Sequence, residues 1–175
     1  DFHNHILPNT DDGAKNIDIS LDMIRLAEKQ GIKEIVNTVH FQHPKMDGLD
    51  ISYDRVMKKL DNLKNHIDSE GIDIKIHIGA EVYFQRNLSE LIDNKLVTFG
   101  SKKYMLVEFP VISFPPGYKE ELFSLDLKGV VPIIAHPERY RQIHEDIKII
   151  KFFYDKGYLI QLDAGSLLGD FGIKV

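Results

Sequence analysis

The chain alternates between segments in which apolar residues recur every three or four positions and short runs in which they recur every second position. Between Ser52 and Gly71 the first spacing holds for Val56, Leu60, Leu63 and Ile67. It places these residues on one face of a helix, and Gly71 suits the left-handed residue that ends a helix. The isoleucines of residues 72–78 then alternate with other residues, as in a strand with one apolar face.

The same order of amphipathic helix, glycine and strand recurs at three further places. These are Leu21, Ile24 and Ala27 with Gly31 and Glu34–Val39; Leu122 and Leu125 with Gly129 and Val130–Ala135; and Ile143, Ile147, Ile150 and Tyr154 with Gly157 and Tyr158–Leu162. Strands at Asp1–His5 and Tyr104–Phe109 bring the predicted number to about six. Serial βα units build either a doubly wound sheet or a (β/α) barrel, and the glycine-rich phosphate loop typical of the former is absent from the sequence.

Composition narrows the range of functions. The 175 residues include no cysteine, which excludes disulfides, thiolate metal sites and a cysteine nucleophile. The formal net charge of −5 argues against a nucleic-acid partner, because nucleic-acid binders carry a basic face. No apolar run reaches the roughly 18 residues of a membrane span, and the first residues lack a signal-peptide pattern. We therefore expect a cytoplasmic protein without membrane insertion.

Residues with metal-ligand chemistry end or follow most of the predicted strands. They are His3, His5, Asp12, His40, Glu81, Glu108 and His136. In a barrel the C-terminal strand ends carry the active site, so these side chains are expected to converge. Histidines and carboxylates without thiolates suit Mn²⁺, Zn²⁺ or Fe²⁺, and this set exceeds the need of a single ion. Paired ions can bind a phosphoryl oxygen and activate water for in-line attack.

Each candidate ligand also has a structural explanation. A lone strand-end histidine such as His40 or His136 is often an ordinary packed residue. Glu81 and Glu108 lie in apolar contexts, where a carboxylate needs a cation or another partner. Asp11 and Asp12 are both candidates for the ligand role. Asp-Asp-Gly is also a common turn sequence, which is the structural explanation for this pair.

Substrate contacts are predicted close to two of these positions. Arg139, three residues after His136, could grip a phosphate bidentately, or could instead pair with a surface glutamate. Tyr140 is expected beside Arg139, and His43 lies in a loop just past His40 from which it could reach a substrate.

Three motifs, read in order, point to a family. They are His3-Asn4-His5, Gly79-Ala80-Glu81-Val82-Tyr83 and His136-Pro137-Glu138-Arg139-Tyr140. With them the chain resembles the polymerase and histidinol phosphatase (PHP) superfamily. Within that superfamily it is similar, over essentially its whole length, to the bacterial capsular and exopolysaccharide manganese-dependent protein-tyrosine phosphatases. The resemblance implies an α/β fold, a distorted (β/α)7 TIM-like barrel with a trinuclear metal centre at its C-terminal face.

The resemblance also implies roles for individual residues. The predicted ligands His3, His5, Asp12, His40, Glu81, Glu108 and His136 match metal positions, and either glutamate could bridge two ions. Arg139 matches the arginine that binds the substrate phosphate. The implied cofactors are two to three divalent ions, with manganese favoured over zinc or iron. Asp163 replaces an asparagine of the family, and whether it adds a further carboxylate near the metals is left open. Because the family's final Asp-x-His pair is absent, residues 1–175 are expected to form a single PHP domain, truncated at its C-terminus.

The implied function is hydrolysis of phosphotyrosine by a metal-activated hydroxide. The implied partner is the phosphorylated tyrosine-rich tail of a bacterial tyrosine kinase that controls polysaccharide export, and a homo-oligomer is compatible with the sequence. A histidinol-phosphate phosphatase or another PHP phosphoesterase is the first alternative, while the net charge disfavours a PHP nuclease. From another class, the chain could be a non-catalytic metal-binding or interaction module.

Overall fold

The computed structural model describes residues 1–49 and 51–170. The chain divides into two compact units, Asp1–Ala80 and Glu81–Val175. Strand β2 (Lys75–Tyr83) runs from the first unit into the second, and the strand order is β1-β2-β3-β4-β5. The predicted α/β class is confirmed, while closure into a seven-unit barrel stays a prediction. Within the described residues, no helix is long and apolar enough to cross a membrane.

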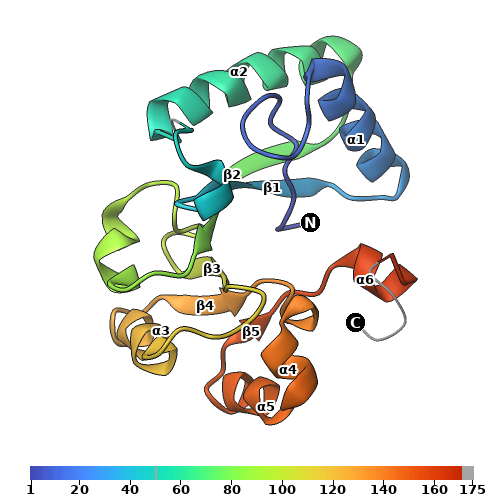
Figure 1. Ribbon diagram of the computed structural model, residues 1–175. Helices are drawn as coiled ribbons and strands as arrows, with labels where there is room; N and C mark the ends of the chain where they lie inside the picture. The colour runs from blue at the N-terminus through green and yellow to red at the C-terminus, as the bar shows by residue number, and fades with distance from the viewer. Residues whose placement is uncertain (50, 171–175) are drawn as a thin grey trace. The chain divides into compact units, whose positions relative to one another are not determined.

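The first unit holds α1 (Ile17–Lys29), β1 (Glu34–Phe41), the 3₁₀ turn η1 (Pro44–Met46) and α2 (Tyr53–Glu70). Both long helices lie on the same side of β1 and β2 (Figure 1). All four apolar positions of the stripe predicted in α2 are buried. Helix α2 ends at Gly71 with a φ of 69°, a left-handed conformation that glycine adopts without steric cost. Local periodicity therefore predicted this part of the fold correctly.

The strand predicted at Asp1–His5 is reduced to a single parallel bridge between Asn4 and Asn37. The segment still lies along β1, because the Asp1 carbonyl accepts a hydrogen bond from the N–H of Val36 at 2.8 Å. The carbonyl of His5, however, accepts from the N–H of Ala14 at 3.0 Å. The chain therefore turns back on itself at His5 before a regular ladder can form.

The second unit contains the parallel strands β3 (Tyr104–Glu108), β4 (Val131–Ile134) and β5 (Leu159–Ile160) beside the end of β2. Its helices are α3 (Tyr118–Leu127), α4 (Arg141–Glu145), α5 (Lys148–Asp155) and α6 (Ala164–Leu168), with 3₁₀ turns η2 (Leu88–Asp93) and η3 (Pro137–Arg139). Helices α3, α4 and α5 lie on one side of β4 and β5 (Figure 1). Strand β4 thus ends close to η3, the turn that carries Arg139.

The single helical stripe predicted from Ile143 to Tyr154 is wrong. The segment forms two helices, α4 and α5, and Ile147 and Tyr154 are 69% and 77% exposed, whereas Phe153 is fully buried. The interruption is at Asp146, whose side chain accepts a hydrogen bond from the N–H of Lys148 at 3.0 Å. A side chain that binds the backbone in this way competes with helix continuation, and the second helix then buries a different face.

An aromatic cluster supports the end of β3. Phe109 stacks on Phe84 with ring centroids 4.9 Å apart and contacts Phe114 at 4.6 Å. Tyr140 and Phe153 complete this cluster around Phe109. The residue before Phe109 is Glu108, so this packing fixes the strand end that carries a candidate metal ligand.

Candidate functional site

The first unit gathers four of the predicted ligands around the turn that follows residues 1–5. The rings of His3 and His5 are 5.5 Å apart between centroids, and those of His5 and His40 are 4.6 Å apart. Asp12 Oδ1 lies 3.3 Å from His40 Nε2. Ligand-type atoms of His5, Asp11 and Asp12 also lie within 4.8 Å of one another. Imidazole nitrogens and carboxylate oxygens this close together fit a divalent ion such as Mn²⁺, Zn²⁺ or Fe²⁺.

Asp11 and Asp12 have different environments. The side chain of Asp11 is 1% exposed, and its Oδ2 lies 2.9 Å from His5 Nδ1 and accepts from the N–H of His40 at 3.1 Å. A carboxylate at Nδ1 fixes the imidazole tautomer and leaves Nε2 as the ligand atom. The side chain of Asp12 is 57% exposed, and its Oδ1 faces Nε2 of His40. These positions favour Asp12 as the ligand and Asp11 as the residue that orients His5.

The pKa of Asp11 reflects these contacts. Burial alone would raise the pKa of its carboxyl group, but the hydrogen bond and the charge of His5 lower it. Backbone N–H groups of Gly13 and His40 add to this effect, and the pKa lies below its usual value. Asp11 is therefore a carboxylate at neutral pH, as its role toward His5 requires.

Helix α2 holds the turn in place. The ammonium group of Lys59 donates to the carbonyl of Asn9 and to Thr10 Oγ1, the latter at 3.2 Å. Burial and the neighbouring Arg55 lower the pKa of Lys59. The turn with its two aspartates is thus tied both to α2 and, through Ala14, to His5.

The second unit gathers the other three predicted ligands at neighbouring strand ends. His136 Nε2 lies 2.8 Å from Glu81 Oε1 and 4.0 Å from Glu108 Oε1, and all three residues are buried. Glu81 lies near the end of β2, Glu108 ends β3 and His136 follows β4. Two buried carboxylates beside an imidazole are costly unless a cation or proton compensates them, so this set also fits a divalent ion. That the two groups of ligands form a single centre stays a prediction.

Gln161 positions His136. Its Oε1 accepts a hydrogen bond from the backbone N–H of His136 at 3.0 Å, and its Nε2 donates to Asp163 Oδ1 at 3.1 Å. The backbone of His136 itself has a φ of 29°, which is unfavourable for a residue other than glycine. Sequence reasoning did not assign Gln161 to the site, although a polar residue near the end of the predicted strand Tyr158–Leu162 was a usable signal.

Arg139 pairs with an aspartate and not with a surface glutamate, the partner that was the alternative to phosphate binding. Its Nη2 contacts Asp163 Oδ2, and its side chain is 35% exposed. Glu145 pairs with Arg141, and Glu138 Oε1 accepts hydrogen bonds from the N–H of Asp163 and from Ser166 Oγ. The guanidinium of Arg139 is thus held by the segment after β5.

Tyr140 is not placed to contact a substrate. It is fully buried, and its hydroxyl oxygen accepts a hydrogen bond from the N–H of Phe109 at 2.9 Å. Burial raises the pKa of Tyr140 well above its usual value, so the phenol is neutral. The predicted substrate-binding role is corrected to packing: Tyr140 belongs to the aromatic cluster that supports β3.

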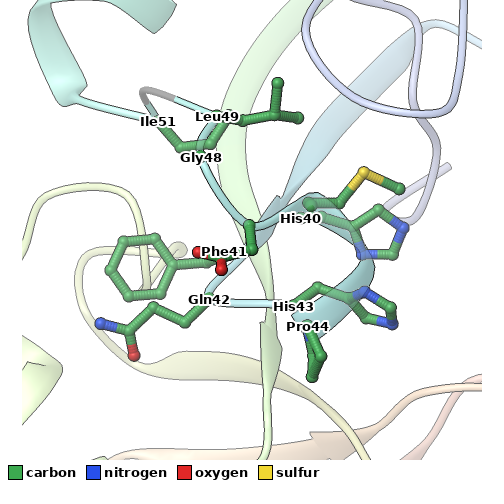
Figure 2. A pocket seen from close by; sticks show the side chains of 10 residues that line it. His40, Phe41, Gln42, His43, Pro44, Gly48, Leu49 and Ile51 are labelled. Atoms are coloured by element: carbon green, nitrogen blue, oxygen red, sulfur yellow. The ribbon is translucent and has the colours of Figure 1, made fainter.

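His43 lines a hollow in the loop between β1 and α2. The hollow has a volume of about 460 Å³, and its lining includes Phe41, Gln42, Met46, Leu49 and Ile51. The ring of His43 lies 4.9 Å from that of His40, and Figure 2 shows both rings on one side of the strand end and Phe41 on the other. A hollow beside a candidate ligand, lined by both apolar and polar side chains, suits an aromatic group with a polar substituent.

The histidines outside the predicted site have other surroundings. His77 Nε2 lies 2.9 Å from Glu34 Oε2 on the surface, and His66 Nδ1 lies 2.8 Å from the carbonyl of Asn62 on α2. Exposed His144 contacts the carbonyl of Glu138. None of these three contacts includes a predicted ligand.

Comparison with known proteins shows what this chain is related to. The family of capsular polysaccharide synthesis proteins CpsB/CapC matches residues 1–175, the whole chain. The chain belongs to the CpsB/CapC family. It is 36% identical to the tyrosine-protein phosphatase YwqE of Bacillus subtilis over 174 residues, which cover 98% of this chain and 67% of YwqE. It is 25% identical to the tyrosine-protein phosphatase CpsB of Streptococcus agalactiae serotype III over 169 residues, which cover 96% of this chain and 68% of CpsB.

A solved structure of this CpsB/CapC group has the same fold. It belongs to a study of YwqE from Bacillus subtilis and CpsB from Streptococcus pneumoniae, described as metal-dependent tyrosine phosphatases. The match has a TM-score of 0.89 at 33% identity and covers 97% of this chain and 68% of the other. The predicted resemblance and the predicted enzyme class, a tyrosine phosphatase, are confirmed at the level of the family. The metal dependence of these relatives agrees with the histidine and carboxylate groups found in each unit.

Proposed function

We propose that this CpsB/CapC protein is a metal-dependent phosphatase that hydrolyses phosphotyrosine on a tyrosine kinase of polysaccharide biosynthesis. The observation that carries the proposal is the arrangement in the second unit. Buried Glu81 and Glu108 lie within 4.0 Å of His136, and Arg139 follows three residues later with its guanidinium held in place. Metal ions held by anionic ligands and a positioned guanidinium can both stabilise the negative charge of a phosphoryl group during transfer.

The bound ions and the side chains of the site have separate roles in the proposed hydrolysis. Divalent ions held by the histidines and carboxylates of the two groups would lower the pKa of water and offset negative charge on the phosphoryl oxygens. Arg139 binds the remaining phosphoryl oxygens through its N–H donors. Asp11 orients His5, and Gln161 holds the backbone of His136. Because the chain has no cysteine, no thiolate of its own can accept the phosphoryl group. The proposed nucleophile is water, which the bound ions would activate.

The hollow at His43 is proposed to take the aromatic leaving group. Its volume of about 460 Å³ exceeds that of a phenol ring, and Phe41, Met46 and Leu49 supply apolar surface. His43 also lines the hollow, and its ring centroid lies 4.9 Å from that of His40. On this basis His43→Ala raises KM for a phosphotyrosyl peptide more than for a small phosphate ester without an aromatic ring.

The decisive test compares substrates for the full-length protein. Initial rates are measured with a phosphotyrosyl peptide, histidinol phosphate and single-stranded DNA, with Mn²⁺ and after chelation. We expect hydrolysis of the peptide that chelation abolishes and Mn²⁺ restores. A preference for histidinol phosphate would overturn the substrate assignment, and degradation of DNA would point to a nuclease.

A matched pair of variants tests the non-catalytic alternative. His136→Ala removes a candidate ligand, whereas His66→Ala removes a half-buried histidine of α2 that lies outside the predicted site. We expect His136→Ala to lower both the bound metal, measured by elemental analysis, and the rate, and His66→Ala to change neither. Stoichiometric metal without turnover in the wild type would favour a metal-binding module.

A further inference from the structure

The carboxylate of Asp163 uses its two oxygens for two different partners. Oδ1 accepts a hydrogen bond from Gln161 Nε2 at 3.1 Å, and Oδ2 pairs with Arg139 Nη2. Gln161 in turn accepts a hydrogen bond from the backbone of His136 at 3.0 Å. Asp163 therefore joins the arginine to the segment that carries a candidate metal ligand, entirely within the second unit.

Asp163 is itself held firmly. Its backbone N–H donates to Glu138 Oε1 at 3.1 Å, and the same oxygen accepts from Ser166 Oγ at 2.7 Å. Glu138 and Arg139 are neighbours in η3, so this turn and Asp163 are connected twice, once through each residue. The side chain of Asp163 is only 19% exposed. An exposed ion pair between two mobile side chains has none of these supports.

We propose that Asp163 is a positioning residue for Arg139, an inference that rests on the proposed phosphatase function. The ion pair holds the guanidinium in one orientation before the substrate arrives, which reduces the conformational entropy lost on binding. A guanidinium has five N–H donors, more than one carboxylate oxygen accepts, so the same group can bind a phosphate while the pair persists. Asp163 thus raises the affinity for the phosphoryl group without touching it.

An asparagine would hold Arg139 less well than Asp163 does. Both oxygens of the carboxylate act as acceptors, whereas an amide offers one acceptor and one donor group. Gln161 cannot rotate its amide to compensate, because its own oxygen is engaged by the N–H of His136. In Asp163→Asn, therefore, an N–H₂ group faces either Gln161 or Arg139.

A double-mutant cycle tests the proposal. Wild type, Asp163→Asn, Arg139→Ala and the double variant are compared by kcat and KM with a phosphotyrosyl peptide. Calorimetry of inorganic phosphate binding to the Mn²⁺-loaded proteins supplies a second readout. We expect Asp163→Asn to raise KM and the phosphate Kd about fivefold and to leave kcat within about twofold. In the Arg139→Ala background the same change has no further effect, because Asp163 acts through Arg139.

The control variant is Glu145→Gln, which removes an exposed ion pair with Arg141 and should change neither constant. Equal effects of Asp163→Asn in both backgrounds would overturn the proposal, since they would show that Asp163 acts independently of Arg139. Tighter phosphate binding in Asp163→Asn would overturn it as well, because Asp163 would then compete with the substrate. If the wild type lacks phosphatase activity, the proposed function fails, and the calorimetric cycle still tests the coupling of the two residues. Failure of the wild type to bind phosphate would overturn both roles.

Discussion

Gly13 lies so close to His5 that a Cβ at position 13 would be 2.1 Å from the carbonyl oxygen of His5 and 2.4 Å from its Cβ. No side chain fits this space, and the contact is with backbone that cannot rotate away. The turn with Asp11 and Asp12 can therefore approach His5 only because residue 13 is glycine. This close approach is what brings the carboxylate of Asp11 to 2.9 Å from the imidazole of His5.

Gly13→Ala is accordingly expected to displace His5 and to weaken metal binding. Titration of the metal-free protein with Mn²⁺ should show a loss of affinity of about 10- to 100-fold, the range found when the groups that orient a ligand are disturbed. Gly31→Ala is the control, since position 31 has open space around it but a φ of +83°. It should lower the free energy of unfolding by about 1 kcal/mol and leave metal affinity unchanged. Equal metal affinity in wild type and Gly13→Ala would contradict this interpretation.

Gln161→Leu is predicted to affect both stability and metal binding. The variant leaves the buried N–H of His136 without its acceptor, which costs about 1 to 3 kcal/mol in the free energy of unfolding. Because the backbone of His136 then has less restraint, the affinity for Mn²⁺ should also fall. Urea unfolding and metal titration measure the two effects, with Gln30→Leu at an exposed position as the control. A loss of stability with unchanged metal affinity would restrict Gln161 to a structural role.

Two buried tyrosines should respond oppositely to the same substitution. The hydroxyl of Tyr140 accepts a hydrogen bond from Phe109, so Tyr140→Phe leaves that N–H unsatisfied and destabilises the fold by about 1 to 3 kcal/mol. The hydroxyl of Tyr158 is buried, and no hydrogen-bond partner for it is found in residues 1–49 and 51–170. Tyr158→Phe should therefore be neutral or stabilising in urea unfolding. Similar losses in both variants would show that the Tyr158 hydroxyl has a partner after all.

Stability should fall at alkaline pH, in part through Tyr158. Burial, with a smaller effect of Asp126, raises the pKa of Tyr158 above its usual value near 10. Between the unfolded and the folded pKa, the unfolded chain has lost the phenolic proton that the folded chain keeps. The free energy of unfolding therefore decreases as the pH rises above about 10. Urea unfolding at neutral pH and near pH 11 should show a smaller decrease for Tyr158→Phe than for wild type. The exposed control Tyr154→Phe, which keeps Tyr158, should show the same decrease as wild type.

Local patterns predicted the secondary structure where a single periodicity decides it. The stripe of α2 and the glycine that ends it are seen in the structure as expected, because helix geometry and the left-handed residue are properties of neighbouring positions. The pattern failed where a side chain competes with the backbone, as at Asp146 between α4 and α5. It failed again at residues 1–5, where a turn takes the His5 carbonyl out of the ladder.

For the candidate site, too, some features could be predicted from the sequence and others could not. The sequence by itself determined which residues have metal-ligand chemistry, because histidines and carboxylates at strand ends are visible in the order of residues. Only the tertiary structure decided their roles: Asp11 orients His5, Tyr140 packs, and Arg139 is held by Asp163. Gln161 reaches His136 across 25 positions and Tyr140 reaches Phe109 across 31, because β3, β4 and β5 are neighbours in the sheet. Pairings over such distances depend on which strands lie side by side, and a local pattern of residues does not contain that information.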